Sequence, residues 1–423
     1  MVPDGWEFKS LTDLAYSIQN GFVGKVSEHY VKDGVPYLMA KNIRYNRITI
    51  DDLETVTLEF QQNNPKVSVK AGDILTVQSG HIGTSAIVPP ELDNSCCHAL
   101  IITKPIQDKI DSHFIAYYLN SPPGRERLSE IFIGTTIKHI NTKDLKKFYV
   151  PVPPLSEQKK IAEILSSVDE AIASTQAVID QTRQVKQGLL QQLLTGGIGH
   201  TRFKESAIGK IPETWNLATI KELVLDEPNS LTAGPFGTIF KAKDFRDSGV
   251  PIIQIRHVTE DGFSWGSKVT YMDESVYEQF HRPYTVKSGD LLITKMGEPP
   301  GIACIYPKKE PFAMVTPDVI KASVDHQKID TYFLMCLYNS PQIKSEILNL
   351  TKGGTRSRVT LDEFYKLLLP CPPLNEQIKI STVLFALDEL IDREKNKLQN
   401  CEGIKRGLMQ DLLTGRIRVR VMP

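Results

Sequence analysis

The sequence lacks an excess of charge of either sign. Its 423 residues include 50 Lys and Arg and 50 Asp and Glu, which gives a formal net charge of zero. A protein that binds nucleic acid alone through a broad basic surface usually carries a clear excess of Lys and Arg. If this chain binds DNA, its positive charge must therefore be gathered on one face or supplemented by a partner.

Long apolar runs and paired cysteines are also absent. No uninterrupted apolar run approaches the roughly 18 residues that a membrane-spanning helix needs, and no signal peptide is recognisable. The six cysteines form no Cys-x-x-Cys pair, so we expect reduced thiols rather than disulfides or a zinc site. With 41% hydrophobic residues, the composition predicts a folded cytoplasmic protein without a membrane segment.

Motifs that mark common catalytic centres are missing. There is no GxxxxGK[ST] phosphate loop, no GxGxxG after a strand and no Asn/Asp-Pro-Pro-aromatic string of amino-methyltransferases. Residues 157–159 match the acidic-x-Lys string of magnesium nucleases by letters only, because a second copy of the segment has Ile378 in place of the lysine. No His-x-x-x-His pair or Ser-His-Asp set can be assigned. We therefore predict no catalytic residue and no metal site.

The most informative feature is an internal repeat. Residues 151–172 match residues 370–391 at 12 of 22 positions without a gap. At the same offset of 219, residues 186–198 match residues 405–417 at nine of 13 positions. The regions before these segments match only in short strings, such as VKAGD and VKSGD. The predicted order is a globular region at 1–150, a conserved region at 151–200, a second globular region at 201–369 and a second conserved region at 370–423.

The conserved regions predict long helices. Each begins after a Pro-Pro pair, has a glutamate in its first turn and contains no further proline until past a Thr-Gly pair. The predicted helices cover residues 156–194 and 375–413, about 58 Å each at 1.5 Å per residue. Apolar residues recur along them at intervals of three and four, and such a stripe needs a partner.

The nearest partner of each stripe is the stripe of the other repeat. Related halves usually associate about a two-fold axis, and an axis perpendicular to the helices makes the pair an antiparallel coiled coil. Two unrelated core helices in separate domains are the alternative. The residues predicted to pack the helices or to bind a partner are Ile161, Leu165, Val168, Ile172, Leu189, Ile380, Leu384, Leu387, Ile391 and Leu408.

The globular regions predict α+β domains. Short β-rich runs bounded by Gly, Pro and Asn are followed in each region by one helical stretch. The expected strands include residues 73–77, 99–103, 250–255 and 290–294, and the expected helices are residues 111–120 and 330–339. The fold class is thus two α+β domains joined by two long antiparallel helices in a pseudo-two-fold repeat.

Polar loops in both globular regions mix basic, amide and aromatic residues. Arg can bind guanine with two hydrogen bonds, Asn and Gln can bind adenine, and Lys can hold phosphates. A solvated loop has the same composition, so recurrence in both halves carries more weight than any single residue. The candidate DNA contacts are Lys41, Asn42, Arg44, Tyr45, Arg47, Gln78, His81, Thr136, Lys138, His139, Lys241, Lys243, Arg256, His257, Lys295, Lys352, Thr355, Arg356 and Arg358.

The whole arrangement resembles the specificity subunit of type I restriction–modification systems. The similarity lies in two divergent domains, each followed by P-x-P-P-L-x-E-Q and by a long helix that ends in K-x-G-L-x-Q-x-L-L-T-G-x-I. The strings at 234–237 (GPFG) and 249–251 (GVP) also look like parts of its target recognition domains. The first half departs from this pattern, because it has NGFVG at 20–24 in place of GPFG.

The resemblance implies a function and a set of partners. Each target recognition domain reads one half of a split, asymmetric sequence in double-stranded DNA, and the helices set the spacer between the halves. The helices also recruit two modification (methyltransferase) subunits, and restriction subunits join them. S-adenosylmethionine then belongs to the modification subunit, and ATP and magnesium belong to the restriction subunit, with no cofactor on this chain.

Other interpretations stay open at this point. One is an enzyme with a nuclease or methyltransferase hidden in one half, against which the missing motifs and the repeat both count. Another is the recognition subunit of a related fused restriction–modification enzyme, and a third is a coiled-coil scaffold without a DNA role.

Overall fold

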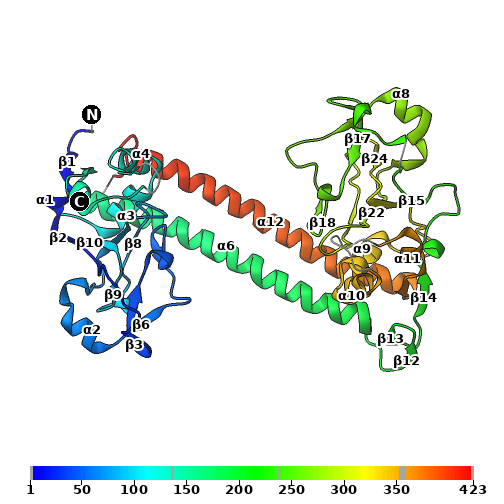
Figure 1. Cartoon of the computed structure of the whole chain (residues 1–423), viewed down its shortest axis with the longest axis horizontal. Helices are drawn as coiled ribbons and strands as arrows, with labels where there is room; N and C mark the ends of the chain where they lie inside the picture. Colours follow the sequence, from blue (N-terminus) through cyan, green and yellow to red (C-terminus); the bar gives the residue numbers. More distant parts are fainter. Residues whose placement is uncertain (1–2, 135–137, 236–238, 352–358, 421–423) are drawn as a thin grey trace. The chain divides into compact units, whose positions relative to one another are not determined.

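In the computed structural model, which describes residues 3–134, 138–235, 239–351 and 359–420, the chain divides into two units. The first unit holds residues 1–177 and 394–423, and the second holds residues 178–393. The divisions fall inside the long helices α6 (Leu155–Gly196) and α12 (Leu374–Leu412) (Figure 1). Each unit therefore combines one globular region with segments of both helices. The boundaries predicted for the four regions of the repeat stay a prediction.

The first unit is built on a four-stranded antiparallel sheet in the order β2-β10-β7-β8. All four residues of β7 are buried, because α3, α4 and the helix segments pack on one face and a second cluster of apolar residues covers the other. Its sequence, Ile-Leu-Thr-Val, consequently has no charged side chain on either face. The elements of this unit are β1 (Glu7–Ser10), α1 (Leu11–Leu14), β2 (Ala15–Asn20), β3 (Tyr30–Leu38), β4 (Ile43–Arg44), β5 (Arg47–Ile48), β6 (Glu54–Val56), α2 (Leu58–Asn63), β7 (Ile74–Val77), β8 (Ser85–Ile87), β9 (Cys96–Cys97), β10 (Leu100–Pro105), α3 (Ser112–Asn120), α4 (Pro122–Ser129), α5 (Thr142–Lys146) and β11 (Tyr149–Val152).

A smaller sheet in the order β6-β3-β9 lies beside the first and contains a parallel pair, β3 with β9. In Figure 1, α2, β3 and β6 occupy the end of this unit that points away from the long helices. The four-stranded sheet thus stands between the helix segments and the smaller sheet.

The second unit repeats this plan. Its central sheet has the order β15-β25-β22-β23, and a five-stranded sheet β16-β20-β17-β24-β21 contains the parallel pair β17 with β24. Its elements are β12 (Phe203–Ser206), β13 (Gly209–Pro212), β14 (Asn216–Thr219), α7 (Ile220–Leu223), β15 (Leu231–Ala233), β16 (Phe245–Arg246), β17 (Val250–Ile253), β18 (Val258–Thr259), β19 (Gly262–Phe263), β20 (Tyr271–Met272), α8 (Glu274–Val276), β21 (Thr285–Val286), β22 (Leu291–Thr294), β23 (Ala303–Ile305), β24 (Ala313–Val315), β25 (Val319–Ala322), α9 (Thr331–Asn339), α10 (Pro341–Leu350), α11 (Leu361–Lys366) and β26 (Leu368–Cys371). The strands and helices predicted in both globular regions are therefore confirmed.

The matching strings VKAGD at 69–73 and VKSGD at 286–290 form the same turn in both units. The Asp73 carboxylate accepts the Lys70 backbone N–H at 2.9 Å, and the Asp290 carboxylate accepts that of Lys287 at 2.8 Å. The intervening glycines, Gly72 and its counterpart, have φ angles of 89° and 90°, a region that glycine enters without steric cost. Divergent sequences thus keep the residues that the turn requires.

The contacts of the glutamate at the start of each long helix explain why this residue recurs in the repeat. The Glu157 carboxylate accepts two hydrogen bonds from Arg418, both at 2.8 Å, and one from the Trp6 indole at 3.3 Å. In the second unit, the Glu376 carboxylate contacts the Trp215 indole at 3.1 Å and His200 at 2.8 Å. Each glutamate joins the start of one helix to the segment that follows the end of the other helix. The role of both glutamates is therefore structural.

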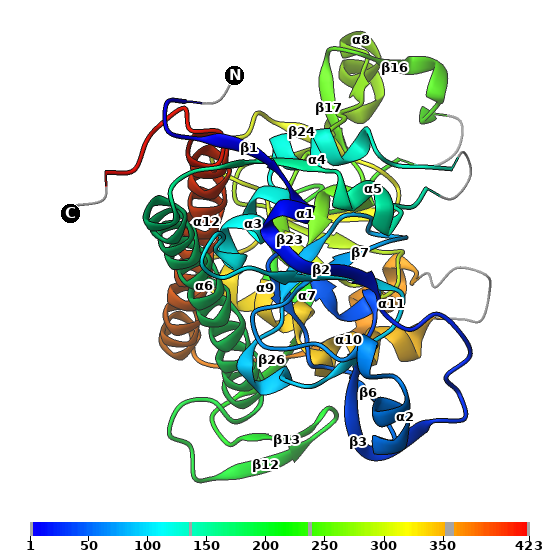
Figure 2. The same cartoon turned by 90° about the vertical axis from the view of Figure 1, so that its left-hand side faces the viewer.

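The helix segments are antiparallel in both units. In the first unit, Asp169 of α6 pairs with Lys405 of α12 at 2.5 Å, while Glu157 lies earlier on α6 and binds beyond the end of α12. In the second unit, Lys186 pairs with Asp388 at 2.5 Å. Figure 2 shows α6 and α12 side by side at the first unit. The predicted antiparallel coiled coil is confirmed.

The residues predicted to pack the helices are all at least partly covered. Five of them are buried, namely Ile161, Leu165, Ile380, Leu384 and Ile391, and five are half-buried, namely Val168, Ile172, Leu189, Leu387 and Leu408. The outer turns of each helix pack on the globular regions, since Ile161 and Leu165 join the first core and Ile380 and Leu384 join the second. Helix packing and domain packing therefore share the same stripe.

Candidate nucleic-acid interface

Three of the predicted loops meet in the first unit. They are the β4–β5 hairpin, the segment 78–84 and the segment around His139. Ser79 forms a backbone bridge with His139, and the Ile140 N–H donates to the Gln78 carbonyl at 3.0 Å. Loops that lie far apart in the sequence thus form one continuous edge.

A cavity of about 320 Å³ lies where the hairpin meets the segment 78–84. It is lined by Arg44, Tyr45, His81, Thr84 and Arg125, together with the hairpin residue Ile43. Two guanidinium groups, a phenol and an imidazole can contact phosphates and the edges of bases. This is the strongest concentration of such groups among the first-unit candidates.

Hydrogen bonds of two asparagines, Asn42 and Asn46, fix the shape of the β4–β5 hairpin. Asn46 adopts a left-handed conformation with a φ of 62° at the turn, as short hairpins require. Its side-chain oxygen accepts from the Asn120 amide at 2.7 Å. Asn42 is buried, and its side chain accepts from the Met39 N–H at 3.0 Å and donates to the Thr49 carbonyl at 3.4 Å. Asn42 therefore shapes the hairpin and does not face a ligand.

The other first-unit candidates differ in their exposure and in their partners within the protein. Lys41 is exposed and pairs with Glu54 at 3.4 Å, and Gln78 donates to Asn20 at 2.7 Å. Arg47 and Lys138 are exposed, and His139 is half-buried. Thr136 lies outside the described residues.

The second unit has a hairpin at the same place, β18–β19. Arg256 is exposed in front of it and donates to the Lys268 carbonyl at 3.2 Å. A cavity of about 370 Å³ is lined by Arg256, His257, Trp265 and residues 266–268. The position that Asn42 fills in the first unit is filled here by His257, whose Nδ1 accepts from the Gln254 N–H at 3.1 Å.

The environment of His257 keeps its ring neutral. Burial and, to a smaller extent, the neighbouring Arg256 guanidinium together lower the pKa of His257 to about 4. The neutral ring can then accept the backbone hydrogen bond that fixes the turn before the hairpin. His257, like Asn42, supports the hairpin from inside.

The remaining second-unit candidates are dispersed. Lys295 is buried and donates to the Pro317 carbonyl at 3.2 Å, and its own carbonyl accepts the Val359 N–H at 3.1 Å, as Gln78 does from Ile140. Lys241 and Lys243 are exposed beside β16. Lys352, Thr355, Arg356 and Arg358 lie outside the described residues.

Sequence analysis missed several residues that line these cavities. Arg125 comes from α4, about 80 residues after the hairpin, and donates to the Ile82 carbonyl. Trp265 and Lys268 follow the second hairpin closely, and Trp265 donates to Glu310 at 2.8 Å. Proximity to an arginine-bearing hairpin could have indicated Trp265 and Lys268, whereas no local signal indicates Arg125.

A family model described as the type I restriction modification DNA specificity domain matches this sequence twice, at residues 3–183 and 212–402. The two matches together cover most of the chain and follow the two halves of the repeat. The chain belongs to this family. Each specificity domain contains one of the two hairpins, with an arginine in the first and just before the second, and most of one long helix.

Two curated relatives match along nearly the whole chain. A putative type I restriction enzyme MjaX specificity subunit from Methanocaldococcus jannaschii is 28% identical over 99% of this chain and 95% of its own length. The EcoKI specificity subunit of Escherichia coli is 23% identical over 93% of this chain and 85% of its own. A crystal structure of the type I S subunit from M. genitalium shares the fold, with a TM-score of 0.60 and 16% identity over 100% of this chain and 97% of that chain.

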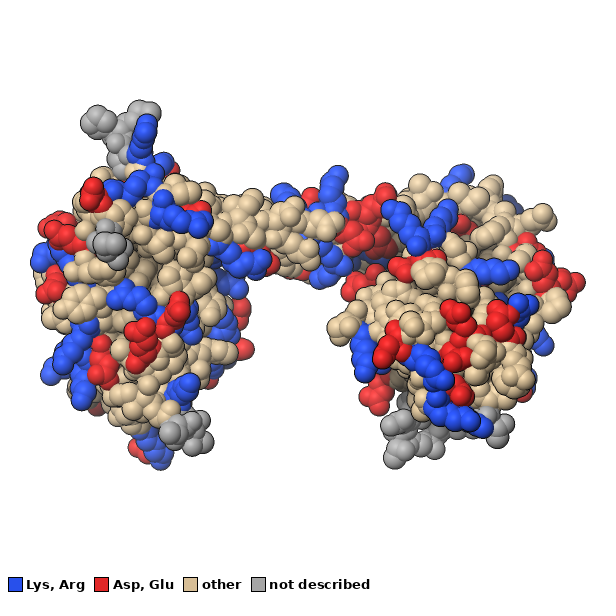
Figure 3. Space-filling model, turned by 90° about the horizontal axis from the view of Figure 1, so that it is seen from above, with Lys and Arg blue, Asp and Glu red and all other residues tan. Residues whose placement is uncertain are grey.

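Charge is mixed on the surface of both specificity domains. Figure 3 shows basic and acidic side chains interspersed over the face that it displays, in agreement with the net charge of zero. Within the described ranges, no group of three or more His, Cys, Asp or Glu side chains is placed to hold a metal ion. No helix in the described part of the chain is both long and apolar enough to cross a membrane.

Proposed function

We propose that this chain is the DNA-recognition subunit of a type I restriction–modification complex, with each specificity domain reading one half of a bipartite, asymmetric site. One observation carries this proposal. The two domains present a hairpin and an adjoining cavity at the same place in the same fold, but with different side chains. Arg44, Tyr45 and His81 stand in one, and Arg256 and Trp265 stand in the other. Equivalent scaffolds with different contact groups suit two different half-sites.

Double-stranded DNA is the expected ligand. Arginine can recognise guanine with two hydrogen bonds in the major groove, and the surrounding lysines can hold the phosphates. Because the chain has no net positive charge, we expect strong binding to depend on partner subunits that add basic surface around the duplex.

The long helices are proposed to set the spacer between the half-sites. Both helices run without interruption across the boundary between the units. A continuous α-helix has a fixed rise of about 1.5 Å per residue, so its length is a fixed quantity that the DNA spacer can match.

The helices are also proposed to recruit two modification subunits. Val185 of α6 and Ile404 of α12 occupy equivalent positions of the repeat and are 53% and 56% exposed. They are two of several exposed apolar side chains on the helix pair, and such side chains are suitable anchors for a partner. Two equivalent positions suit two copies of the same subunit, with restriction subunits joining the assembly.

The chemistry is proposed to reside on the partners. S-adenosylmethionine would bind the modification subunits, and ATP and magnesium the restriction subunits, with all of them in the cytoplasm, where the DNA is. The chain alone should transfer no methyl groups to DNA and hydrolyse neither DNA nor ATP. Incubation of the purified chain with DNA and a labelled methyl donor tests this, and methylation without a partner would contradict it.

The function itself is tested by methylome sequencing. The chain and its modification subunit are expressed together in a host that lacks other DNA methyltransferases. We expect one methylated motif made of two defined half-sites and a spacer of any sequence. A contiguous motif, or no methylation by an assembled complex, would reject the proposal.

A further inference from the structure

A lysine is buried in the central sheet of the second unit where the first unit has isoleucine. Lys321 of β25 lies opposite Leu292 of β22, and the first unit pairs Ile102 with Leu75 at the same register. The Lys321 side chain is only 7% exposed. Burial lowers its pKa, the Asp290 carboxylate raises it, and Lys287 lowers it again. An ammonium group buried in this way destabilises a fold unless it is paired.

Nothing in the described part of the second unit pairs with the Lys321 ammonium. Asp290 is the acid that acts on it, but one Asp290 oxygen accepts the Lys287 N–H at 2.8 Å and the other accepts the Ser323 hydroxyl at 2.7 Å. No hydrogen bond or ion pair of the Lys321 ammonium occurs among the described residues. The fold therefore keeps an unpaired cation at a position where an apolar side chain fits.

Lys321 is one of the residues that line a pocket of about 580 Å³ with several basic groups. Arg282, Lys287 and Lys321 supply three positive charges, and Glu278 supplies one negative charge. The Glu278 carboxylate accepts from Arg282 Nε at 2.5 Å. The Asp290 carboxylate acts on Lys321 only at a distance, so neither Lys287 nor Lys321 has a direct ion pair among the described residues. The remaining lining residues are Pro228, Asn229, Tyr277, Pro283, Thr285 and Phe312.

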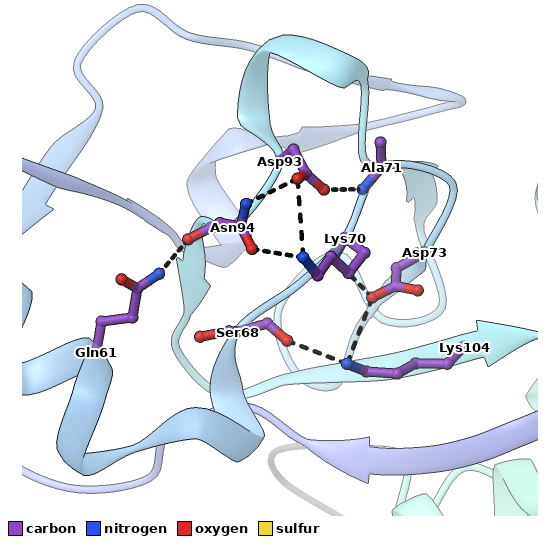
Figure 4. Close-up of polar contacts among 8 residues, drawn as sticks. All are labelled: Gln61, Ser68, Lys70, Ala71, Asp73, Asp93, Asn94 and Lys104. Carbon is purple, nitrogen blue, oxygen red and sulfur yellow. Dashed lines mark hydrogen bonds and ion pairs between the residues drawn. The ribbon is translucent and has the colours of Figure 1, made fainter.

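The first unit shows the same region with its charges neutralised. There, Lys70 donates to Asn94 at 2.7 Å and lies 3.9 Å from Asp93 (Figure 4). Lys104 lies 3.8 Å from Asp73 and donates to the Ser68 carbonyl at 3.3 Å. Lys70 corresponds to Lys287 in the repeat, but no ion pair of Lys287 occurs among the described residues. Only the second unit thus offers uncompensated positive charge here.

The pocket and the cavity at the second hairpin share no lining residue. Strand β22 runs from Leu291 to Thr294, with the turn that contains Lys287 before it and Lys295 after it. Lys287 and Lys295 consequently stand at opposite ends of the strand. A cavity of about 620 Å³ that includes Trp265, Tyr277 and Phe312 borders both of them.

We propose that Lys321, Lys287 and Arg282 form a binding pocket for a phosphate group in the second unit. A phosphate anion complements the excess of positive charge in the pocket, and its oxygens can accept from ammonium and guanidinium groups together. The phosphate belongs either to a small phosphorylated molecule or to the DNA backbone, since the chemistry of recognition is the same.

Calorimetric titration of the full chain with inorganic phosphate tests the pocket at constant ionic strength, with acetate as the control anion. We expect saturable phosphate binding that Lys321→Ile weakens at least tenfold, because this change restores the residue of the first unit. The matched control, Lys366→Met, removes an exposed lysine of α11 and should change the affinity less than twofold. Equal binding by the wild type and Lys321→Ile, or equal binding of acetate and phosphate, would overturn the proposal.

DNA binding by the same variants distinguishes the two sources of the phosphate, the DNA backbone and a small molecule. If the backbone fills the pocket, inorganic phosphate competes with DNA and Lys321→Ile lowers the slope of log affinity against log salt by about one. If a small molecule fills it, that slope is unchanged and phosphate and DNA bind together. Either outcome supports the pocket, and the phosphate titration does not depend on the proposed DNA-recognition function.

Discussion

At the scale of single residues, the same backbone hydrogen bond precedes both hairpins, but an amide accepts it in one and an imidazole in the other. Asn42 and His257 occupy equivalent buried positions, and each accepts the backbone N–H that lies three residues earlier. An amide accepts this bond at any pH, whereas an imidazole accepts it only while it is neutral. The second hairpin therefore carries a sensitivity to acid that the first lacks.

We predict that the second unit loses stability as the pH falls from about 6.5 to about 4. The folded-state pKa of His257 is about 4 and lies below the unfolded value, so the unfolded chain binds the proton first and acid favours unfolding. The loss attributable to His257 should approach about 3 kcal/mol near pH 4. Urea unfolding at pH 5 and pH 7.5 measures it. His257→Asn, which installs the residue of the first unit, should reduce the difference, and an undiminished difference would contradict the assignment.

At the scale of secondary-structure elements, two repeated ion pairs hold the long helices in register. Lys405 with Asp169 and Lys186 with Asp388 each join α6 to α12 at 2.5 Å. Each aspartate also accepts from a tyrosine of the neighbouring globular region, Tyr117 at 2.8 Å and Tyr332. The pairs therefore join the two helices to each other and to the domains.

Breaking one pair should destabilise its unit. Lys186→Met leaves Asp388 partly buried without its cation, and we expect a loss of about 1–3 kcal/mol in unfolding free energy. Lys160→Met breaks an exposed pair on the same helix and should cost less than about 1 kcal/mol. Chemical denaturation of both variants gives the comparison. Similar losses in the two would mean that the Lys186 pair has no special role.

The elements also show where sequence analysis succeeds. The long helices were predicted to within two residues at each end, because prolines, glycines and the spacing of apolar residues are local signals. The cavities were not predicted, because they join residues such as Arg44 and Arg125 that only tertiary structure brings together. Asn42 and His257 were predicted as ligand contacts because they are polar. A sequence does not reveal that a polar side chain is buried, as both of these are.

At the scale of the whole molecule, the proposed function rests on two related domains joined by two continuous helices. We predict that four residues inserted after Thr182 in α6 lengthen the DNA spacer by one to two base pairs and leave both half-sites unchanged. Four residues add roughly 6 Å and one turn, which keeps the apolar stripe in phase, whereas two residues rotate it by about 200°. Methylome sequencing of the four-residue variant should show the longer spacer. The two-residue variant should mostly fail to fold, and an active four-residue variant with an unchanged spacer would show that the helices do not set it.

The central claim, that each domain reads its own half-site, is tested most directly by methylome sequencing of Arg44→Ala and Arg256→Ala complexes side by side. Both arginines are exposed at the hairpins, and a base pair read by one arginine is worth about 1–3 kcal/mol of discrimination. Arg44→Ala should relax positions in one half-site and Arg256→Ala positions in the other, with the spacer unchanged in both. Relaxation of the same half-site by both variants, or a uniform loss of methylation with both half-sites intact, would contradict the account.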